Sequence, residues 1–339
     1  MRRIVITITF SLAYFFSIQF ILANEINIYS HRQPFLIKPF LEAFTNETGI
    51  ETNVVYSTKG LAQRLRAEGE NSPADVILTV DIGRLYIYED MGLLAEIQSE
   101  VLDNAIPKHL KSANNTWFGL SKRSRIIATS RERVSEEAIL RIEDLADPRW
   151  RGKICSRPGS HVYNRALMAS VIAQYGKKEA EVWAKGLVSN LARRPQGNDR
   201  AQVKAIYEGL CDLAIINNYY FGKLKYSEDP KQRQWADSMR LTFPNQGKGD
   251  RGAHINISGG GVAKHSKRKG NAIRLLEFLS SERAQRLYSE INFEYPVNPN
   301  VEPSDELNSW GRFREDQIPI EKIAQLSMDA QKIIDKVGW

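Results

Sequence analysis

The chain has 339 residues, with 47 Lys and Arg against 40 Asp and Glu and a formal net charge of +7. This length exceeds what one small core needs and predicts two domains. Charges of both signs are interspersed along the chain, which argues against a nucleic-acid-binding protein, whereas the modest positive excess suits an anionic ligand or an anionic membrane surface.

The first segment has the pattern of a secretory signal. Arg2 and Arg3 precede a long apolar run without a charge, and Ala23 ends the run before a polar stretch. We therefore expect residues 1–23 to be a cleaved signal peptide, so that the remainder of the chain works outside the cytoplasm. Because the run approaches the length of a membrane span, an uncleaved anchor is the alternative.

The residues after this segment alternate between strand and helix patterns. Residues 25–30 are typical of a strand, and residues 34–49 of an amphipathic helix that ends at a glycine. A second strand is expected at 50–57, a second helix at 59–69, and a nearly continuous apolar strand at 74–80. This alternation predicts a parallel sheet with helices on both faces, the doubly wound α/β arrangement.

A second α/β unit follows a long strand pattern at 117–130. Short strands are expected at 152–158 and 211–218. Helical patterns follow at 162–175, 177–189, 199–209, 269–280, 281–291 and 318–338. Two such units joined by long strands predict a hinged protein whose ligand lies in a cleft at the strand ends.

The same pattern predicts the domain boundaries. We assign residues 24–124 to the first α/β domain and residues 125–248 to the second. Residues 249–298 are expected to return to the first domain, and residues 299–339 to form helices that pack mainly on the second.

The sequence contains two cysteines, Cys155 and Cys211. Outside the cytoplasm, an isolated pair of this kind is most often a disulfide. We therefore predict a Cys155–Cys211 bond, which would hold together two strand ends. The alternative, a thiolate metal site, lacks the number of ligands and the close spacing of zinc sites.

Three tyrosines stand at expected transitions from strand to helix in the second unit, namely Tyr163, Tyr219 and Tyr220. Such positions place side chains at the mouth of a cleft. Phenolate is a hard oxygen donor whose pKa of about 10 requires a small, highly charged cation such as Fe(III) to displace the proton. The alternative is that these tyrosines are interfacial residues with hydrated hydroxyl groups.

Five segments carry a resemblance to a known family: residues 72–85, 121–130, 194–224, 254–266 and 292–299. Through them the chain resembles the ferric-ion-binding proteins of bacterial ABC importers, a transferrin-like subgroup of periplasmic solute-binding proteins. The resemblance implies a type II periplasmic-binding-protein clamshell, with two α/β domains, each a mostly parallel sheet flanked by helices, joined by crossing hinge strands. It also implies that Tyr219 and Tyr220, in "INNYY", bind Fe(III) together with Tyr163.

The first-domain ligands of the family are partly replaced in this chain. Gln33 and Pro34 stand where several members carry a histidine or a histidine–tyrosine pair, and Val80 stands where some supply a glutamate. The pattern is similar to the subgroup in which a synergistic anion, such as carbonate or a small carboxylate, completes the coordination. The resemblance then implies that Arg32 and Arg123 face that anion.

The charges agree with this picture. Three phenolates offset Fe(III), and a bidentate anion that fills two further positions calls for the planar fork of a guanidinium. Gln33 is a further candidate for the anion site. His31 lies two residues before the family's histidine position, so it is either a metal ligand or a supporting or surface histidine.

The resemblance implies a periplasmic, monomeric, high-affinity receptor that delivers Fe(III) to an ABC importer, a permease and ATPase complex in the inner membrane. No nucleic acid and no catalysis are expected, since GxSxG, HExxH and the P-loop pattern are missing from the sequence and "SGGGVA" resembles a phosphate loop only loosely. The alternative is a solute-binding protein of the same fold for an oxyanion, a thiamine-like cation or a polyamine. Sites for the two cations would favour carboxylates and aromatic faces over a tyrosine pair with two arginines.

Overall fold

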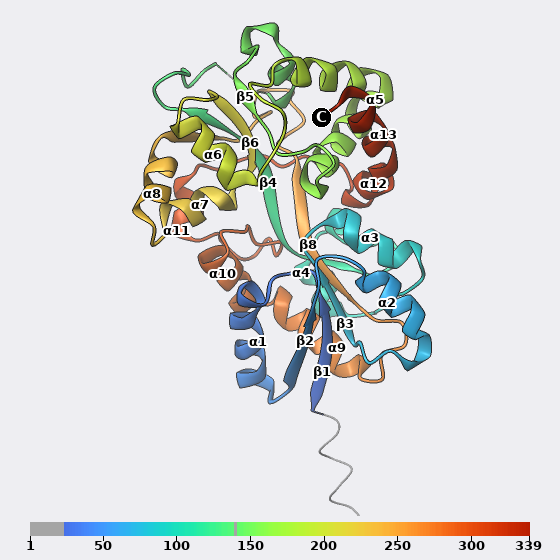
Figure 1. Ribbon diagram of the computed structural model, residues 1–339. Helices are drawn as coiled ribbons and strands as arrows, with labels where there is room; N and C mark the ends of the chain where they lie inside the picture. Colours follow the sequence, from blue (N-terminus) through green and yellow to red (C-terminus); the bar gives the residue numbers. More distant parts are fainter. Residues whose placement is uncertain (1–23, 139–140) are drawn as a thin grey trace, which may run out of the picture.

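The computed structural model describes residues 24–138 and 141–339, and the expected signal peptide lies outside the described residues. The chain forms two lobes, and the long strands β4 (Phe118–Ser130) and β8 (Ile255–Val262) cross between them (Figure 1). None of the described helices combines the length and the apolar character that crossing a membrane requires.

One lobe is built on three parallel strands in the order β2-β1-β3, namely β1 (Glu25–Ser30), β2 (Glu51–Tyr56) and β3 (Val76–Thr79). Strand β8 pairs antiparallel with β3 and with the first half of β4. The helices of this lobe are α1 (Pro34–Thr48), α2 (Leu61–Glu68), α3 (Ile82–Asp90), α4 (Glu100–Ala105), α9 (Lys269–Ser280) and α10 (Glu282–Ile291). Each strand and helix expected between residues 25 and 80 is confirmed to within a few residues.

The expected apolar stripe places α1 against this sheet. Phe40, Leu41 and Phe44 are buried, and the helix ends at Gly49, whose φ of 69° lies in the left-handed region that favours glycine. Leu36, in the first turn, is only half-buried. The helix therefore packs through its middle and end, while its first turn stays at the surface between the lobes.

The second lobe differs from the expected mostly parallel sheet. The second half of β4 pairs antiparallel with β6 (Leu213–Asn217) and with β7 (Met239–Thr242), whereas β5 (Ile154–Cys155) pairs parallel with β6. The reason is the route of the chain. Strand β4 enters from the other lobe and runs opposite to β6, while β5 and β6 are joined by the helical crossover that parallel pairing requires.

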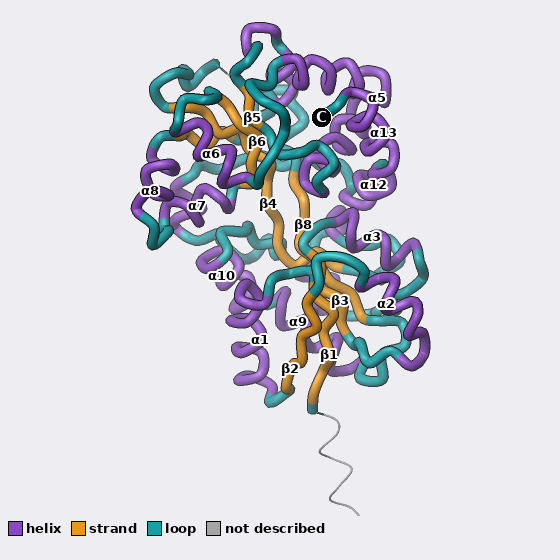
Figure 2. Tube along the Cα trace, viewed as in Figure 1, coloured by secondary structure: helices purple, strands orange, loops and turns teal. Residues whose placement is uncertain are grey.

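The helices of the second lobe are α5 (Val162–Ser189), α6 (Asp199–Tyr207), α7 (Tyr219–Lys225), α8 (Pro230–Asp237), α11 (Asp305–Ser309), α12 (Ile320–Gln325) and α13 (Ser327–Val337). The two helices expected before residue 190 are joined in α5, but the chain leaves helical geometry at Gly176, with a φ of 82°. The expected last helix is divided into α12 and α13. Helix α13 packs on α5, and α12 packs on both α5 and α3 (Figure 2).

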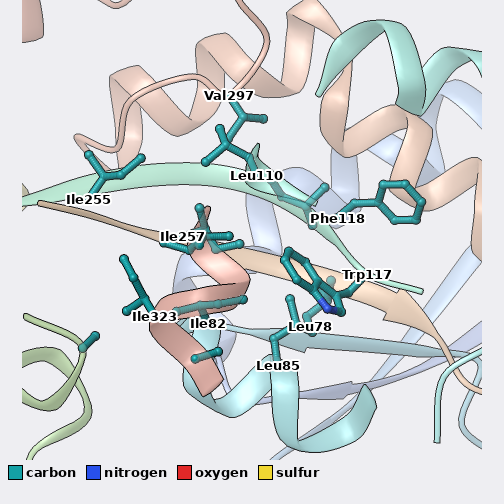
Figure 3. Close-up of a cluster of buried hydrophobic side chains, with 14 of the residues drawn as sticks. Leu78, Ile82, Leu85, Leu110, Trp117, Phe118, Ile255, Ile257, Val297 and Ile323 are labelled. Carbon is teal, nitrogen blue, oxygen red and sulfur yellow. The ribbon is translucent and has the colours of Figure 1, made fainter. Parts of the chain in front are cut away.

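Apolar packing continues from one lobe to the other beside the crossing strands. Figure 3 shows Trp117, Ile257 of β8 and Ile323 of α12 in one cluster of buried side chains. The glycines 259–261 of "SGGGVA" lie within β8, where a Cβ atom would come within 2.5–2.8 Å of the backbone oxygens of Phe118, Ile77 and Thr116. These glycines therefore allow the strands to pack closely, and they belong to a strand instead of the phosphate loop that the segment loosely resembles.

Candidate functional site

A cavity of about 280 Å³ lies between the lobes, where β1 and β6 end. Its walls include the segment after β1, the middle of β4 and the first residues of α5 and α7. All seven residues predicted to bind iron or the anion line this cavity: His31, Arg32, Gln33, Arg123, Tyr163, Tyr219 and Tyr220.

The two adjacent tyrosines share the cavity because the strand ends before them. Strand β6 ends at Asn217 and helix α7 begins at Tyr219, so the pair follows helical geometry instead of the alternation of a strand. The ring centroids of Tyr219 and Tyr220 are 4.6 Å apart. The Tyr219 hydroxyl donates to the Tyr163 hydroxyl at 3.2 Å and accepts from the Asn217 side-chain amide at 3.1 Å.

Tyr219 and Tyr220 hold their protons at neutral pH. Burial, and then the neighbouring phenols Tyr163 and Tyr220, raise the pKa of Tyr219 well above its ordinary value. Burial together with Asp199 raises the pKa of Tyr220 to about 12. A ligand must therefore displace these protons, which favours a highly charged cation over a neutral solute.

Three guanidinium groups surround the Tyr163 ring. The carbons of the Arg123, Arg125 and Arg157 guanidiniums lie 5.5, 5.9 and 5.1 Å from its centroid. Asp199, fully buried, accepts from Arg125 at 2.7 Å and from Arg157 at 3.0 Å. The ring of Tyr163 therefore lies among three cations, two of which are paired with Asp199.

Arg125 and Asp199 were not among the predicted residues. Arg123 and Arg125 are two positions apart on β4, so their side chains leave the same face of the strand. Two arginines with that spacing in one long strand are the signal that could have found Arg125. Its pairing with Asp199 is a long-range contact and has no local signal.

Arg32 and Arg123 each keep one buried nitrogen without a partner. Arg32 is 3% exposed, and its Nη2 donates to Glu294 and, at 2.7 Å, to Ser258 Oγ. Arg123 donates through Nη2 to the carbonyl of Val80. The Nη1 atoms of both arginines are buried and have no hydrogen-bond acceptor in the described part of the chain. Both residues line the cavity, so these donors fit an anion bound there.

Glu294 is a cavity residue that was not predicted. It is 7% exposed and lines the cavity, although its segment "NFEYPVNP" contributed to the family resemblance. Burial opposes its ionisation, but Arg32 and Arg123 outweigh burial and hold the pKa of Glu294 below its ordinary value. A carboxylate thus faces the guanidinium that was expected to face an anion.

His31 lies in the cavity wall with both ring nitrogens engaged. Nδ1 lies 2.7 Å from the Ser57 carbonyl and Nε2 lies 2.9 Å from the Tyr88 hydroxyl. Burial lowers the pKa of His31, so the ring is neutral, with Nδ1–H donating to the carbonyl and Nε2 accepting from Tyr88. This arrangement leaves no free lone pair on His31, which favours the supporting role over the ligand role.

Other cations add to the positive charge of the cavity. Arg84, Arg200 and Lys223 also line it, and the Arg200 guanidinium lies 5.3 Å from the centroid of the Tyr220 ring. Gln33 is exposed at the surface of the cavity. With Glu294 as the carboxylate in the wall, the cationic side chains outnumber the anionic ones, and the cavity suits an anion.

Cys155 and Cys211 form a disulfide, with their Cα atoms 5.8 Å apart. The bond connects the end of β5 to the segment just before β6. Eight residues further along the chain, each of these segments reaches a cavity tyrosine, Tyr163 in one case and Tyr219 in the other. The disulfide thereby ties together the two segments that carry the phenols.

The family model for bacterial extracellular solute-binding proteins matches residues 71–314. The chain belongs to this family. Iron uptake protein A1 of Synechocystis sp. (strain ATCC 27184 / PCC 6803 / Kazusa) is 41% identical to this solute-binding protein over 317 residues, which cover 93% of this chain and 88% of the relative. The major ferric iron-binding protein of Neisseria meningitidis serogroup A is 27% identical, with 93% of each chain covered.

Solved structures of the same kind superpose on nearly the whole molecule. Ferric iron-binding protein A of Mannheimia haemolytica, in an open conformation, has a TM-score of 0.87 and 47% identity, over 93% of this chain and 98% of that one. A Trichodesmium protein in complex with iron and citrate ligands has a TM-score of 0.88 and 43% identity, over 93% of this chain and 99% of that one. The predicted family resemblance and the type II clamshell fold of this solute-binding protein are therefore confirmed.

Proposed function

We propose that this solute-binding protein is an extracytoplasmic receptor that binds Fe(III) and delivers it to an ABC importer. The observation that carries the proposal is the group of three phenols, Tyr163, Tyr219 and Tyr220, in one cavity whose wall also holds unpartnered guanidinium nitrogens. Phenolates are donors for a small, highly charged cation, and the guanidiniums are donors for the anion that would share its coordination.

Binding would begin on the second lobe, which carries all three phenols. Fe(III) as cargo displaces their protons, and three phenolates balance its charge. Three guanidiniums lie 5.1–5.9 Å from the centroid of the Tyr163 ring and add positive charge beside the phenols. The remaining coordination positions are left for a synergistic anion, carbonate or a small carboxylate, held by the free Nη1 donors of Arg32 and Arg123.

We further infer that the two lobes are the domains expected from the sequence, with boundaries near residues 124, 248 and 298. Arg32 follows β1 of one lobe, whereas the phenols belong to the other. Bending of the crossing strands β4 and β8 would move Arg32 relative to the phenols, exclude water and strengthen each charge contact.

The partners follow from the family and from the relatives. The proposed partner is the permease and ATPase complex of an importer in the inner membrane, which a monomeric receptor meets in the periplasm. The relatives are named for iron uptake and ferric iron binding, and the proposed role is transport without catalysis.

Titration of the iron-free protein with a weak ferric chelate tests the proposal. Phenolate-to-iron charge transfer should give a visible absorption band that grows to one iron per protein. Tyr207→Phe is a matched control, since Tyr207 is an exposed tyrosine of α6 outside the cavity, and it should give the same band. A protein that stays colourless and instead binds sulfate or phosphate would support the oxyanion receptor.

A further inference from the structure

The carboxylate of Glu294 occupies one end of the Arg32 guanidinium. Arg32 Nη2 donates to both carboxylate oxygens, at 2.7 and 2.8 Å. Ser121 of β4 and Ser258 of β8 also donate to Glu294. The residue is thus fixed by Arg32 of the first lobe and by both strands that cross between the lobes, while Arg32 Nη1 remains free.

The neighbouring residue fixes Glu294 to the helix that carries the tyrosine pair. Phe293 has a φ of 56°, a region that aromatic residues rarely adopt. Its carbonyl accepts from the Asn218 side chain at 3.1 Å, and a Cβ atom on Gly222 of α7 would lie 2.5 Å from its ring. Packing against α7 therefore holds this backbone conformation, and with it the position of the Glu294 carboxylate.

This geometry changes the charge that an incoming anion meets. Arg32 and Glu294 together carry no net charge, so the pair offers Nη1 as a hydrogen-bond donor without the full attraction of a cation. An anion at Nη1 also meets the repulsion of a carboxylate on the far side of the same guanidinium. Because Coulomb energy scales with the product of the charges, this repulsion is twice as large for a dianion as for a monoanion at the same place.

We propose that Glu294 sets the charge selectivity of the anion site, lowering its preference for doubly charged over singly charged carboxylates. Glu294 is a positioning residue that acts through Arg32, and it reduces the affinity for dianions most. The identity of the cargo rests on the proposed function, but the selectivity itself is a property of the iron-free protein.

Isothermal titration of the iron-free protein with acetate and with oxalate tests this inference. Glu294→Gln keeps an oxygen for Arg32 but removes the charge. If the change raises the acetate affinity about tenfold, it should raise the oxalate affinity about a hundredfold, since the dianion escapes twice the repulsion. Glu294→Asp keeps the charge and should keep the wild-type ratio of the two affinities.

Glu315→Gln is the matched control. Glu315 is also a carboxylate paired with a cation of β4, Lys122, at 3.0 Å, but it does not line the cavity. This change should leave the oxalate-to-acetate ratio unchanged. An unchanged ratio in Glu294→Gln as well would overturn the inference.

Two further comparisons keep the test decisive. Removing one partner of a buried ion pair is strongly destabilising, so Glu294→Gln requires a thermal unfolding check. If that variant does not fold, the double change Arg32→Gln/Glu294→Gln leaves no unpaired buried charge. Because it removes a pair without net charge, the oxalate-to-acetate ratio should stay near that of the wild type, and a large fall in the ratio would overturn the inference. Ferric titration is done separately, so a wild type that takes no iron contradicts the proposed function without deciding the role of Glu294.

Discussion

At the scale of single residues, the chemistry of the cavity follows from donors that the sequence places at strand ends. Tyr163, Tyr219 and Tyr220 could be predicted because each follows a recognisable strand, and the structure brings them into one wall. Glu294 could not be predicted in this way. Its partner Arg32 lies 262 residues earlier in the chain, and no local pattern encodes a pairing over that separation.

The phenol pair leads to the first prediction. Tyr219→Phe keeps the ring but removes one anionic donor, so the fold should survive. Loss of a residue that only orients a metal ligand lowers metal affinity ~10–100-fold. Loss of a ligand itself should lower the ferric affinity by more than this. Competition with citrate measures the change. Tyr207→Phe provides the comparison, and equal ferric affinities in the two variants would contradict the phenolate site.

The engaged nitrogens of His31 lead to a second prediction, on stability. The unfolded chain takes up a proton on His31 near pH 6.5, whereas the lowered pKa of His31 in the folded state delays this uptake. The unfolded state therefore binds more protons as pH falls below about 6.5, and folding stability declines. In His31→Gln the decline of the unfolding free energy between pH 7 and pH 5 should be smaller.

Urea unfolding at the two pH values checks this prediction. His265, an exposed histidine outside the cavity, gives the control variant His265→Gln, which should decline as steeply as the wild type. An equal decline in His31→Gln would show that His31 is protonated as readily in the folded state as in the unfolded one.

At the scale of elements, the parallel strands β1, β2 and β3 could be predicted because each is followed by an amphipathic helix that can cross over the sheet. The antiparallel pairing of β4 with β6 and β7 could not. The pattern of residues 117–130 indicates a strand but not its direction, which depends on β4 starting in the other lobe. The same pattern cannot show that half of the strand pairs with β8.

The disulfide gives a prediction at this scale. Cys155 and Cys211 are buried, are separated by 56 positions in the sequence, and close a loop that contains α5 and α6. Cys155→Ala/Cys211→Ala should lower the free energy of unfolding by about 2–4 kcal/mol, because the unfolded chain gains the freedom that the bond removes. Urea denaturation measures the loss, and an unchanged midpoint and slope would show that pairing of β5 with β6 suffices without the bond.

At the scale of the whole molecule, the two lobes contribute different halves of the chemistry. One lobe presents the phenols and the positive surround of Tyr163, and the other presents Arg32 beside Glu294. A cargo cation and its anion would therefore contact both lobes at once. This division links binding to the relative position of the lobes, which the crossing strands β4 and β8 determine.

The central claim is that three phenolates hold Fe(III) while Arg32 and Arg123 hold an anion. A crystal structure of the iron-loaded protein, with the metal located by its anomalous scattering, tests it most directly. We expect the oxygens of Tyr163, Tyr219 and Tyr220 on the metal, an anion between the metal and the two arginines, and His31 still bonded to Ser57 and Tyr88. Iron bound through His31 or Glu294, with the three phenols free, would contradict the account.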